Sequence, residues 1–520
     1  MDNIKRYLGM IILLAVLGAG VYSFLLKQEE TKKITYSTSD AKNLKGVISI
    51  ALDSWIGYFP FRSPVFGQLM RDAGYRLKII DDNADYRGRM KSLKSGEIDF
   101  AVCTIDSYII NGKSVSYPGA IVTVIDESKG GDALISWMRT VSNIDELKKK
   151  TDVTIAFTPD SPSEHLLKTI GVHFDVPMLQ QKDGPWRVEV DGAEAAYKKF
   201  INHKVDLAVV WEPHVSEALA KPGTVKLMGS EDIDKLIVDI LVANRKFAHK
   251  KPELVLLFLK NYFKTLNVYL ASPAKLSKDI KSQINVTNRQ VKFMLKGVKW
   301  IHYPENVRWF GLVSQTSLSR PEIIESITTT VNILKDMKDI SSNPLPDGDP
   351  YTIINSSFLR EMYSAGSGDS SVFRYTGNTL ARKFKKLSDK EWNRLKVVGA
   401  LKLRPVSFRS GTDTLDDNGR SQIRNIVSNV RHYPNFRILV KGHTGLRGDP
   451  QANRELSRGR ARAVKKELMY SYNIDDNRIH VVGAGASQPF SKNPDESDRE
   501  YNNRLKRVEL LFVTGNQANR

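Results

Sequence analysis

The chain has 520 residues, of which 41% are apolar and 26% are charged, and this ordinary globular composition excludes collagen-like, mucin-like and wholly disordered proteins. Its single cysteine, Cys103, excludes an intramolecular disulfide and a cysteine-based zinc site. The formal net charge is +20, and residues 381–520 hold 29 Lys and Arg against 15 Asp and Glu, an excess of 14 positive charges. Such an excess indicates an anionic partner: nucleic acid, a membrane surface or an acidic wall polymer.

Residues 1–26 predict a membrane anchor. Tyr7 to Leu26 is an uncharged run of 20 residues, and at about 1.5 Å per residue a helix of this length spans a bilayer core of about 30 Å. Lys5 and Arg6 precede the run and favour a cytoplasmic N-terminus. A cleaved signal peptide is the alternative, but the run is long for one and no clean Ala-x-Ala site follows. We therefore expect a single-pass inner-membrane protein with the bulk of the chain in the periplasm.

The stretch 27–45 is polar and without helical or strand periodicity, so we expect a linker there. From residue 46 to 363, short β-rich runs alternate with longer amphipathic stretches, which predicts an α/β region with mostly parallel sheets. The predicted strands are Val47–Leu52, Leu77–Ile80, Phe100–Cys103, Val153–Phe157 and Leu207–Val210.

An internal duplication indicates that this region has two similar lobes. Residues Tyr86–Asp106 match Ala193–Pro213 in order: a helix, a small polar turn, Ile or Val followed by Asp, an apolar strand and a polar loop. Asp99 and Asp206 occupy the same place in the two copies, and we interpret both as structural caps. Two α/β lobes direct the carboxyl ends of their strands toward a shared cleft, where ligands bind.

The two-lobed region resembles the periplasmic solute-binding proteins of the nitrate, sulfonate and taurine uptake class. The motifs that carry the resemblance are Ser54-Trp55-x-Gly57, Gly96-x-Ile98-Asp99, Thr104-x-Asp106-Ser107, Asp126-x-Ser128-x-Gly130-Gly131-Asp132 and Trp211-Glu212-Pro213. The resemblance implies a two-lobed, type II-like periplasmic-binding-protein fold that closes on a small ligand.

Several residues of this region are candidates for ligand binding. Ser161 and Ser163 open a predicted helix, whose free amides attract an anionic group, although either serine could simply cap the helix. Trp55 and Trp211 follow or end equivalent strands and are expected to face each other, either against a ligand or in ordinary packing between lobes. Polar groups at the other predicted strand ends are suited to hold an amine, to form salt links on closure, or to remain solvated; they are Asp106, Ser107, Asp132 and Glu212.

A second module is expected over residues 398–515, followed by a tail, 516–520. It is preceded by a linker and a basic helical segment over 364–397. The predicted strands are Leu401–Phe408, Arg437–Lys441, Arg478–Val482 and Arg507–Val513, and the predicted helices are Ser421–Val430 and Arg454–Tyr470. This order predicts a compact α+β sandwich.

The C-terminal module resembles the OmpA-like peptidoglycan-binding domain. The resemblance rests on Lys441-Gly442-His443-Thr444, Asn453-Arg454-Glu455-Leu456-Ser457-x-x-Arg460-Ala461, Gly483-x-Gly485-x-Ser487-x-Pro489 and Arg507-Val508-Glu509. It implies binding of a diaminopimelate-type wall peptide, with Arg460 at the place of the arginine that pairs with the peptide's carboxylate. The other candidate contacts are Thr444, Asp449 and Asn453.

One position departs from the OmpA-like pattern. Gly445 stands where the family carries an Asp directly after Gly-His-Thr, so the group expected to hold the ammonium of the peptide is missing. Loss of one charge-assisted contact costs roughly 1.5–3 kcal/mol, a ten- to hundredfold weakening. Asp449 could substitute for it through a different loop path. We therefore expect wall binding that is weakened, altered or directed to another anionic chain.

No motif for catalysis, phosphate binding or metal binding is found, so we expect neither an enzyme nor a cofactor. Nucleic acid is not expected, because the module lies beyond a membrane anchor and lacks aromatic residues interleaved with its basic ones. The favoured hypothesis is a membrane-anchored periplasmic protein that binds a small anionic or zwitterionic solute between its lobes and attaches to peptidoglycan, alone or within a membrane-protein complex. The alternatives are a structural spacer or assembly platform with a degenerate binding domain, and an enzyme on the same scaffold.

Overall fold

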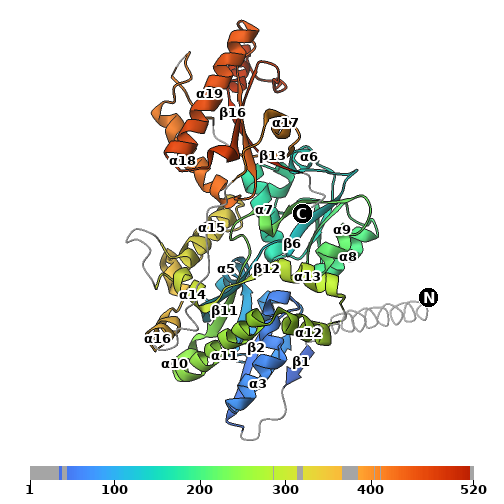
Figure 1. The fold of residues 1–520 in the computed structure, drawn as a ribbon, viewed down its shortest axis with the longest axis vertical. Coiled ribbons are helices and arrows are strands. Elements are labelled where there is room, and N and C mark those ends of the chain that lie inside the picture. Colours follow the sequence, from blue (N-terminus) through green and yellow to red (C-terminus); the bar gives the residue numbers. More distant parts are fainter. Residues whose placement is uncertain are drawn as a thin grey trace, which may run out of the picture.

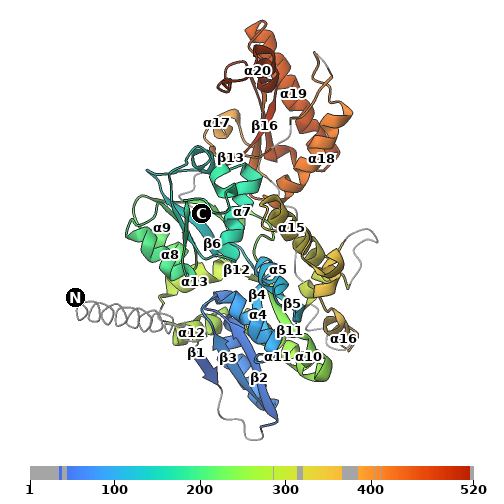
Figure 2. The same ribbon diagram turned by 180° about the vertical axis from the view of Figure 1, so that it is seen from behind.

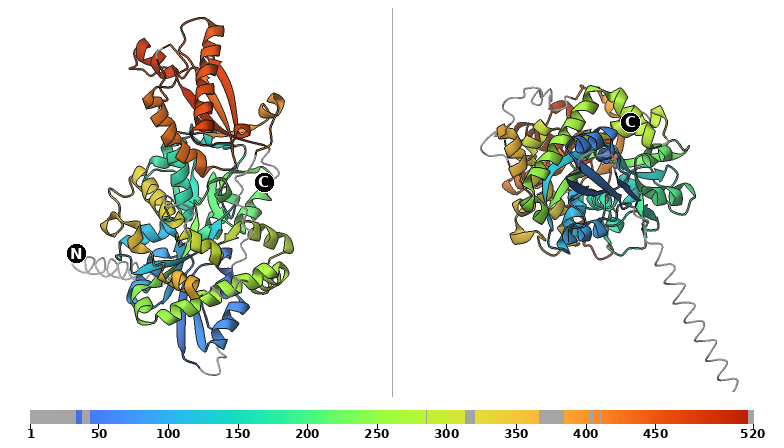
Figure 3. Two further views of the ribbon diagram at one scale, coloured as in Figure 1. Left: turned by 60° about the vertical axis from the view of Figure 1, so that its left-hand side comes forward. Right: turned by 90° about the horizontal axis from the view of Figure 1, so that it is seen from below.

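A computed structural model describes residues 34–37, 44–284, 286–312, 320–365, 384–402, 405–409 and 411–515. Three sheets follow one another along the long axis of the molecule, with an N-terminal lobe at one end, a second lobe in the middle and the C-terminal module at the other end (Figures 1 and 3). Within the described ranges, no helix combines the length and apolar character needed to cross a membrane. The expected anchor, 1–26, and the tail, 516–520, lie outside the described residues.

Lobe 1 is built on a seven-stranded sheet of order β1-β3-β2-β4-β11-β5-β12. Its strands are β1 (Ile34–Ser37), β2 (Gly46–Leu52), β3 (Tyr75–Asp81), β4 (Phe100–Thr104), β5 (Gly119–Ser128), β11 (Val238–Asn244) and β12 (Val298–Trp300). Its helices are α2 (Phe59–Arg62), α3 (Pro64–Asp72), α4 (Tyr86–Ser95), α5 (Ile105–Lys113), α10 (Arg245–Lys250), α11 (Pro252–Ala271), α12 (Pro273–Gln283), α13 (Asn288–Lys296), α14 (Tyr303–Trp309), α15 (Glu322–Asp336) and α16 (Ser357–Ala365), with 3₁₀ turns η1 (Ile56–Tyr58), η4 (Pro346–Gly348) and η5 (Pro350–Ile353).

Lobe 2 is built on a five-stranded sheet of order β10-β6-β9-β7-β8. Its strands are β6 (Asp132–Trp137), β7 (Ile155–Phe157), β8 (Arg187–Glu189), β9 (Leu207–Trp211) and β10 (Thr224–Gly229). Its helices are α6 (Ile144–Leu147), α7 (Pro162–Phe174), α8 (Gly192–Ile201) and α9 (His214–Leu219), with 3₁₀ turns η2 (Pro177–Gln180) and η3 (Ser230–Asp232).

The duplication is visible as the same helix-to-strand unit in both lobes, α4-β4 in lobe 1 and α8-β9 in lobe 2. The two equivalent aspartates make the same contacts. Asp99 Oδ2 accepts hydrogen bonds from the backbone N and the hydroxyl of Ser49, both at 2.8 Å, and Asp206 Oδ2 accepts the corresponding pair from Thr154, both at 2.9 Å. Each carboxylate thus ties the start of its strand to the neighbouring strand.

Two expectations about the sheets were wrong. The sheets are mixed, not mostly parallel, because β11 is antiparallel to β4 and β5 in lobe 1 and β6 is antiparallel to β9 and β10 in lobe 2. Only the repeated units contribute parallel pairs, such as β2 with β3 and β7 with β9. In addition, part of the expected linker is ordered, since Ile34–Ser37 forms β1 and pairs antiparallel with β3.

The C-terminal module has a four-stranded sheet of order β13-β16-β14-β15, with its long helices α18 and α19 packed together (Figure 2). Its strands are β13 (Lys396–Ala400), β14 (Arg437–His443), β15 (Ile479–Gly485) and β16 (Val508–Thr514). Its helices are α17 (Asp389–Trp392), α18 (Asp417–His432), α19 (Pro450–Tyr470) and α20 (Asp498–Leu505), with the 3₁₀ turn η6 (Asp476–Arg478). Helix α19 lies so close to β14 that a Cβ at Gly442 would be 2.0 Å from the Ser457 carbonyl oxygen, which leaves room for glycine alone.

The first strand of this module was predicted too far along the chain. The expected strand Leu401–Phe408 is absent from its described part, and β13 forms upstream at Lys396–Ala400, where it pairs with β16. Pro405 explains the difference, because proline lacks the amide hydrogen that a strand interior needs. Of the expected basic helical segment over 364–397, the described residues show one short helix, α17.

Lobe 2 and the C-terminal module share one hydrophobic core. A single cluster of buried residues joins Phe174 at the end of α7 to Tyr433 and Phe512 of the module, with ring centroids 5.4 and 6.2 Å from Phe174. Polar contacts reinforce the junction: His173 Nδ1 and the Tyr433 hydroxyl are 2.7 Å apart, and the backbone N of Ala400 donates to Asp145 Oδ1 at 2.9 Å. The module is therefore fixed to lobe 2, while lobe 1 has a core of its own.

Candidate functional site

The chain passes between the two lobes twice. Residues 129–131 lead from β5 to β6, and residues 230–237 lead from β10 back to β11. Ser230 connects the two crossings, because its hydroxyl accepts a hydrogen bond from the backbone N of Gly130 at 2.9 Å and lies 2.7 Å from the hydroxyl of Ser128. Two adjacent crossings of this kind form a hinge about which one lobe can rotate against the other.

A cavity of ≈ 20 Å³ lies beside this hinge, between the lobes. Its volume is enough for about one water molecule, so the lobes are closed on each other. Both lobes and the second crossing, through Ile237, contribute to its walls, which consist of Asp53, Trp55, Tyr58, Tyr86, Thr104, Asp132, Pro162, Trp211, Ile237 and Asp239.

Asp53 is the one lining carboxylate with a cationic partner. Arg89, fully buried, donates from Nη2 to Asp53 Oδ2 at 3.1 Å and from Nε to Asp82 Oδ2 at 2.8 Å. These bonds place the guanidinium between two carboxylates of lobe 1. The charge of Arg89 is therefore balanced by these two carboxylates, and the guanidinium does not line the cavity.

Asp239 and Asp126 form a buried carboxyl pair. They are opposite each other on β11 and β5, where two like charges repel. The Tyr58 hydroxyl donates to Asp239 Oδ1, and the Trp55 indole donates to Asp126 Oδ1 at 3.2 Å. Burial and the neighbouring carboxyl raise the pKa of Asp239 well above its ordinary value, and burial raises the pKa of Asp126 to about 7.

Asp132 begins β6 directly after the first crossing. Its Oδ2 accepts a hydrogen bond from the Ser128 hydroxyl at 2.6 Å. Burial raises the pKa of this carboxyl to about 7, against the lowering effect of that hydrogen bond. Asp132 in the cavity wall and Asp126 beside Asp239 thus have pKa values near neutral pH.

The start of α7 faces the cavity through Pro162. Ser161 is the N-cap of the helix: its hydroxyl donates to the Thr158 carbonyl at 2.6 Å and accepts from the Ser163 backbone N at 3.2 Å. The hydroxyl of Ser163 is buried without a hydrogen-bond partner. Neither serine lines the cavity, so the capping alternative describes Ser161 directly.

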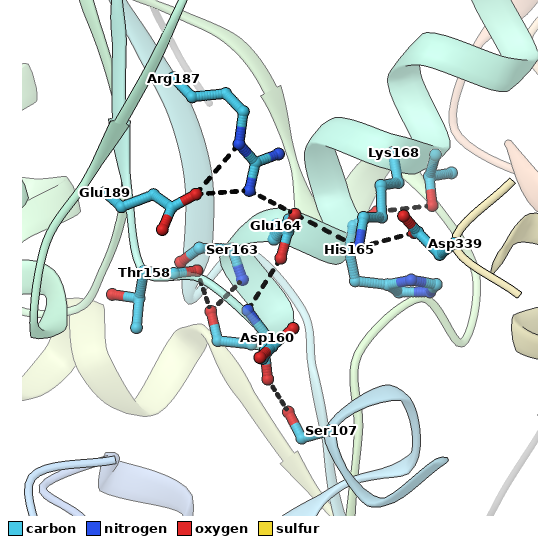
Figure 4. Close-up of polar contacts among 12 residues, drawn as sticks. Ser107, Thr158, Asp160, Ser163, Glu164, His165, Lys168, Arg187, Glu189 and Asp339 are labelled. Atoms are coloured by element: carbon cyan, nitrogen blue, oxygen red, sulfur yellow. Dashed lines mark hydrogen bonds and ion pairs between the residues drawn. The ribbon is translucent and has the colours of Figure 1, made fainter. Parts of the chain in front are cut away.

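Several contacts join the two lobes next to the cavity. The Ser107 hydroxyl in lobe 1 donates to the Asp160 carbonyl in lobe 2 at 3.3 Å. Lys168 of α7 forms ion pairs with Glu164 at 3.3 Å and with Asp339, just beyond α15, at 2.8 Å (Figure 4). We call Lys168 and Asp339 the interlobe ion pair.

Of the eight residues predicted from the sequence to bind the solute, some line the cavity and others do not. Three of them line the cavity, namely Trp55, Asp132 and Trp211. Asp106 is buried and does not line the cavity, and its Oδ2 has no hydrogen-bond partner among the described residues. Glu212 is taken up locally, since its carboxylate accepts from the backbone N and the hydroxyl of Ser216 at the start of α9.

The residues missed from the sequence are Asp53, Tyr58, Tyr86 and Asp239. For Asp239 a signal existed: it is the one charged residue in the apolar run Leu236–Ala243, and a carboxyl inside a buried strand needs a partner or a function. For Tyr58 and Tyr86 there was none, because aromatic residues near strand ends are common in ordinary cores.

In the C-terminal module, the predicted wall-binding residues lie around the end of β14 and on α19. Thr444 is buried, and its hydroxyl has no hydrogen-bond partner. Asp449 is the N-cap of α19 and accepts from the Ala452 backbone N at 2.8 Å, and the Asn453 amide donates to the Arg447 carbonyl at 3.0 Å. In this structure Asp449 is therefore engaged as the cap of α19.

Arg460 is oriented by contacts with Thr412 and Phe408 in the segment before α18. Its Nε donates to the Thr412 carbonyl at 3.1 Å, and its guanidinium lies 5.3 Å from the centre of the Phe408 ring. Partial burial lowers the pKa of Arg460 despite the nearby Asp413. At Gly445, a Cβ would approach the side-chain oxygen of Asn502 to 3.1 Å and its backbone oxygen to 3.3 Å, so a larger residue requires a shift of a few tenths of an ångström in this segment.

Comparison with known proteins identifies this module. The OmpA family model matches residues 407–503. Outer membrane porin F of Pseudomonas aeruginosa is 31% identical over 100 residues, which cover 19% of this chain and 29% of that protein. Outer membrane protein Omp38 of Acinetobacter baumannii is 30% identical over 113 residues, 22% of this chain and 31% of that protein. The chain thus spans less than a third of these relatives' length, and the OmpA-like character of the C-terminal module is confirmed.

Solved structures similar to the two-lobed region include two sulfonate-binding proteins. The alkanesulfonate-binding protein SsuA of Xanthomonas axonopodis pv. citri, bound to MOPS, has 12% identity and a TM-score of 0.46 over 61% of this chain and 99% of its own. The aliphatic sulphonate binding protein SsuA of Escherichia coli has 14% identity and a TM-score of 0.46 over 60% and 99%. The two-lobed arrangement expected from the sequence is confirmed by the sheets and crossings described above.

Proposed function

We propose that the protein is a tethered receptor of the cell envelope. It binds a small solute between its two lobes, is anchored in the inner membrane through residues 1–26, and attaches to peptidoglycan through its C-terminal module. The observation that carries the solute-binding part is the cavity at the hinge, whose walls combine carboxyl groups and aromatic rings from both lobes. In the closed state the cavity holds about one water molecule, so a solute enters it when the lobes open about the hinge.

The wall-binding part of the proposal is supported by the OmpA family match and by Arg460. The arginine is oriented by Thr412 and Phe408, so its guanidinium is pre-organised for a carboxylate. With glycine at position 445, we propose that the affinity for a diaminopimelate-type peptide is lower than in members that carry the acid.

The residues that line the cavity narrow the charge expected of the solute, which the sequence left as anionic or zwitterionic. No Lys or Arg is among the residues that line the cavity, so a purely anionic solute lacks a cationic side chain to meet it there. A zwitterionic solute keeps a group that suits the carboxyls. Binding without turnover remains our proposal, and an enzyme on this scaffold is the less favoured alternative.

A structural spacer is the second candidate, and the contacts between the lobes favour it. The interlobe ion pair and the Ser107–Asp160 contact hold the lobes together across a cavity of only ≈ 20 Å³. A platform that never opens would need such contacts and no ligand. Separating the two candidates requires a direct test of solute binding.

The test is thermal unfolding of the full-length protein against a panel of small solutes. A receptor is stabilised by its ligand, because binding to the native state alone raises the unfolding temperature. Trp55→Ala should abolish this stabilisation, whereas Lys199→Ala, an exposed change on α8, should leave it intact. Stabilisation of Trp55→Ala equal to that of the wild type would favour the spacer.

Wall attachment is tested by cosedimentation with purified peptidoglycan. We expect Arg460→Ala to lower the sedimented fraction, and Arg462→Ala to serve as the matched control, because Arg462 is exposed on the same helix. Equal loss in both variants would indicate attraction to the basic helix surface instead of recognition by Arg460.

A further inference from the structure

We infer that the interlobe cavity selects an organic cation, such as a solute with a primary ammonium group. When the cation binds, the carboxyl groups of Asp239 and Asp132 lose their protons and become its counter-charges, and the aromatic rings around them are its walls. This inference rests on the proposed receptor function and adds the charge class of its ligand.

The charge balance of the cavity is the first reason. Three carboxyl groups line it, Asp53, Asp132 and Asp239, and only Asp53 has a cationic partner, Arg89. Three lysines near the interface between the lobes form ion pairs with other carboxylates. Lys129 pairs with Glu127 and Asp234. Lys299 pairs with Glu127, and Lys168 pairs with Glu164 and Asp339. The cavity therefore presents uncompensated acidic groups.

An unpartnered oxygen is the second reason. Asp239 is 2% exposed and lines the cavity, and its Oδ2 has no hydrogen-bond partner among the described residues. Oδ2 of Asp126, opposite it on the neighbouring strand, is also without one, and a proton shared between the two carboxyls is the donor that the wall itself offers them. A buried carboxyl oxygen left without a donor costs free energy, and a donor on a ligand recovers it. An ammonium group supplies three such donors.

The aromatic walls are the third reason. Two of the four rings, Trp55 and Tyr58, come from the loop after β2, Tyr86 comes from the start of α4, and Trp211 comes from lobe 2. Trp55 and Tyr58 also hold the two carboxyls through hydrogen bonds. Rings beside carboxylates attract a cation through their faces and pack against the carbon atoms attached to it. Because rings and acids occur on both lobes, such a ligand bridges the lobes and favours closure.

Metal binding is a different reading of an acidic cavity. In the part of the chain that the structure describes, no group of three or more His, Cys, Asp or Glu side chains is arranged to hold a metal ion. The four aromatic rings that share the lining also suit an organic cation better than a hydrated metal ion, which needs oxygen ligands on several sides.

The experiment compares solutes of opposite charge on the full-length protein. The cationic probes are n-propylammonium, choline and putrescine, and the anionic probes are nitrate and propane-1-sulfonate, all at matched ionic strength. Thermal unfolding ranks them, and isothermal titration gives the affinity of the best. We expect a cationic probe to stabilise the wild type, and Asp239→Asn to weaken its binding at least tenfold. Asp183→Asn, an exposed change on lobe 2, is the matched control and should bind as the wild type does.

The outcomes separate this inference from the proposed function. Stabilisation by nitrate or propane-1-sulfonate, without any by the cations, would overturn the inference and leave the receptor function standing. No stabilisation by either class would count against the receptor function as well. Should Asp239→Asn fail to fold, Asp132→Asn takes its place, because it removes the carboxyl on the lobe 2 side of the same cavity.

Discussion

At the scale of single residues, the buried carboxyls of the cavity make folding depend on pH. Burial raises the pKa of both Asp126 and Asp132 to about 7, far above the value of an aspartate in an unfolded chain. Between about pH 4 and pH 7 the native state keeps protons that the unfolded state has lost. The contribution of these groups to stability is therefore present below this window and falls as pH rises through it.

We predict that Asp132→Asn makes the protein more stable at pH 8 and flattens this part of the pH profile. The asparagine is uncharged, so it avoids the cost of ionising a buried acid, which amounts to as much as about 4 kcal/mol for a pKa displaced from near 4 to about 7. Chemical denaturation at pH 5 and pH 8 measures the effect, with Asp183→Asn as the surface control. An unchanged slope between the two pH values would show that Asp132 does not titrate in this window.

Gly445 is the second residue at which a single substitution tests the account, because the OmpA-like pattern has an aspartate there. We predict that Gly445→Asp strengthens wall binding by roughly tenfold or more, since one charge-assisted contact is worth about 1.5–3 kcal/mol. The new Cβ would lie 3.1 Å from the side-chain oxygen and 3.3 Å from the backbone oxygen of Asn502, so the side chain fits after a shift of a few tenths of an ångström in that segment. Affinity for a soluble diaminopimelate-containing peptide is the readout, and Gly445→Asn is the uncharged control. A gain in the control equal to that of the aspartate would rule out the charge as its cause.

At the scale of elements, α7 links three functions. Its first turn faces the cavity through Pro162, its middle carries Lys168 of the interlobe ion pair, and its last residues, His173 and Phe174, contact the C-terminal module. A change in the position of this helix on closure would therefore alter its contacts with the cavity, with Asp339 and with the C-terminal module. The helix is therefore positioned to couple the cavity to the C-terminal module.

We predict that Lys168→Met shifts the molecule toward an open state. Methionine keeps the packing of the buried stem but leaves Asp339 without its cation, a loss of roughly 1.5–3 kcal/mol. Spin labels at Lys94→Cys and Lys199→Cys, exposed on lobes 1 and 2, report the lobe separation, and Cys103, the one native cysteine, is buried. The expected result is a longer mean distance than in Lys198→Met, which alters an exposed pair on α8; identical distances would show that the ion pair does not hold the lobes.

The sequence allowed the repeated units to be predicted, because each is a local strand, loop and helix with its own pattern. Asp99 and Asp206 behave as expected for that reason. Strands β5 and β11, which lead into the first crossing and out of the second, were not predicted, since their pairing is decided by contacts between residues far apart in the sequence. The same holds for the site: Trp55 and Trp211 follow recognisable strands, whereas Asp239 enters the cavity only through the return crossing.

At the scale of the whole molecule, the shared core makes lobe 2 and the C-terminal module one unit, with lobe 1 as the second unit beyond the hinge. The second crossing also touches the module, as the Asp234 backbone N donates to the His432 carbonyl at 2.6 Å. In a protein held at the membrane through its N-terminus and at the wall through its C-terminus, closure on a solute would change the relative orientation of the two attachments. This is how the proposed receptor would convert binding into a mechanical signal.

The most direct measurement of the central claim is native mass spectrometry of the full-length protein purified from its source cells. The account predicts one small molecule bound per chain, released on unfolding, and lost from the Asp239→Asn protein but kept by Asp183→Asn. A chain that carries no small molecule in any preparation, and gains none when incubated with a small-molecule extract of the same cells, would contradict it.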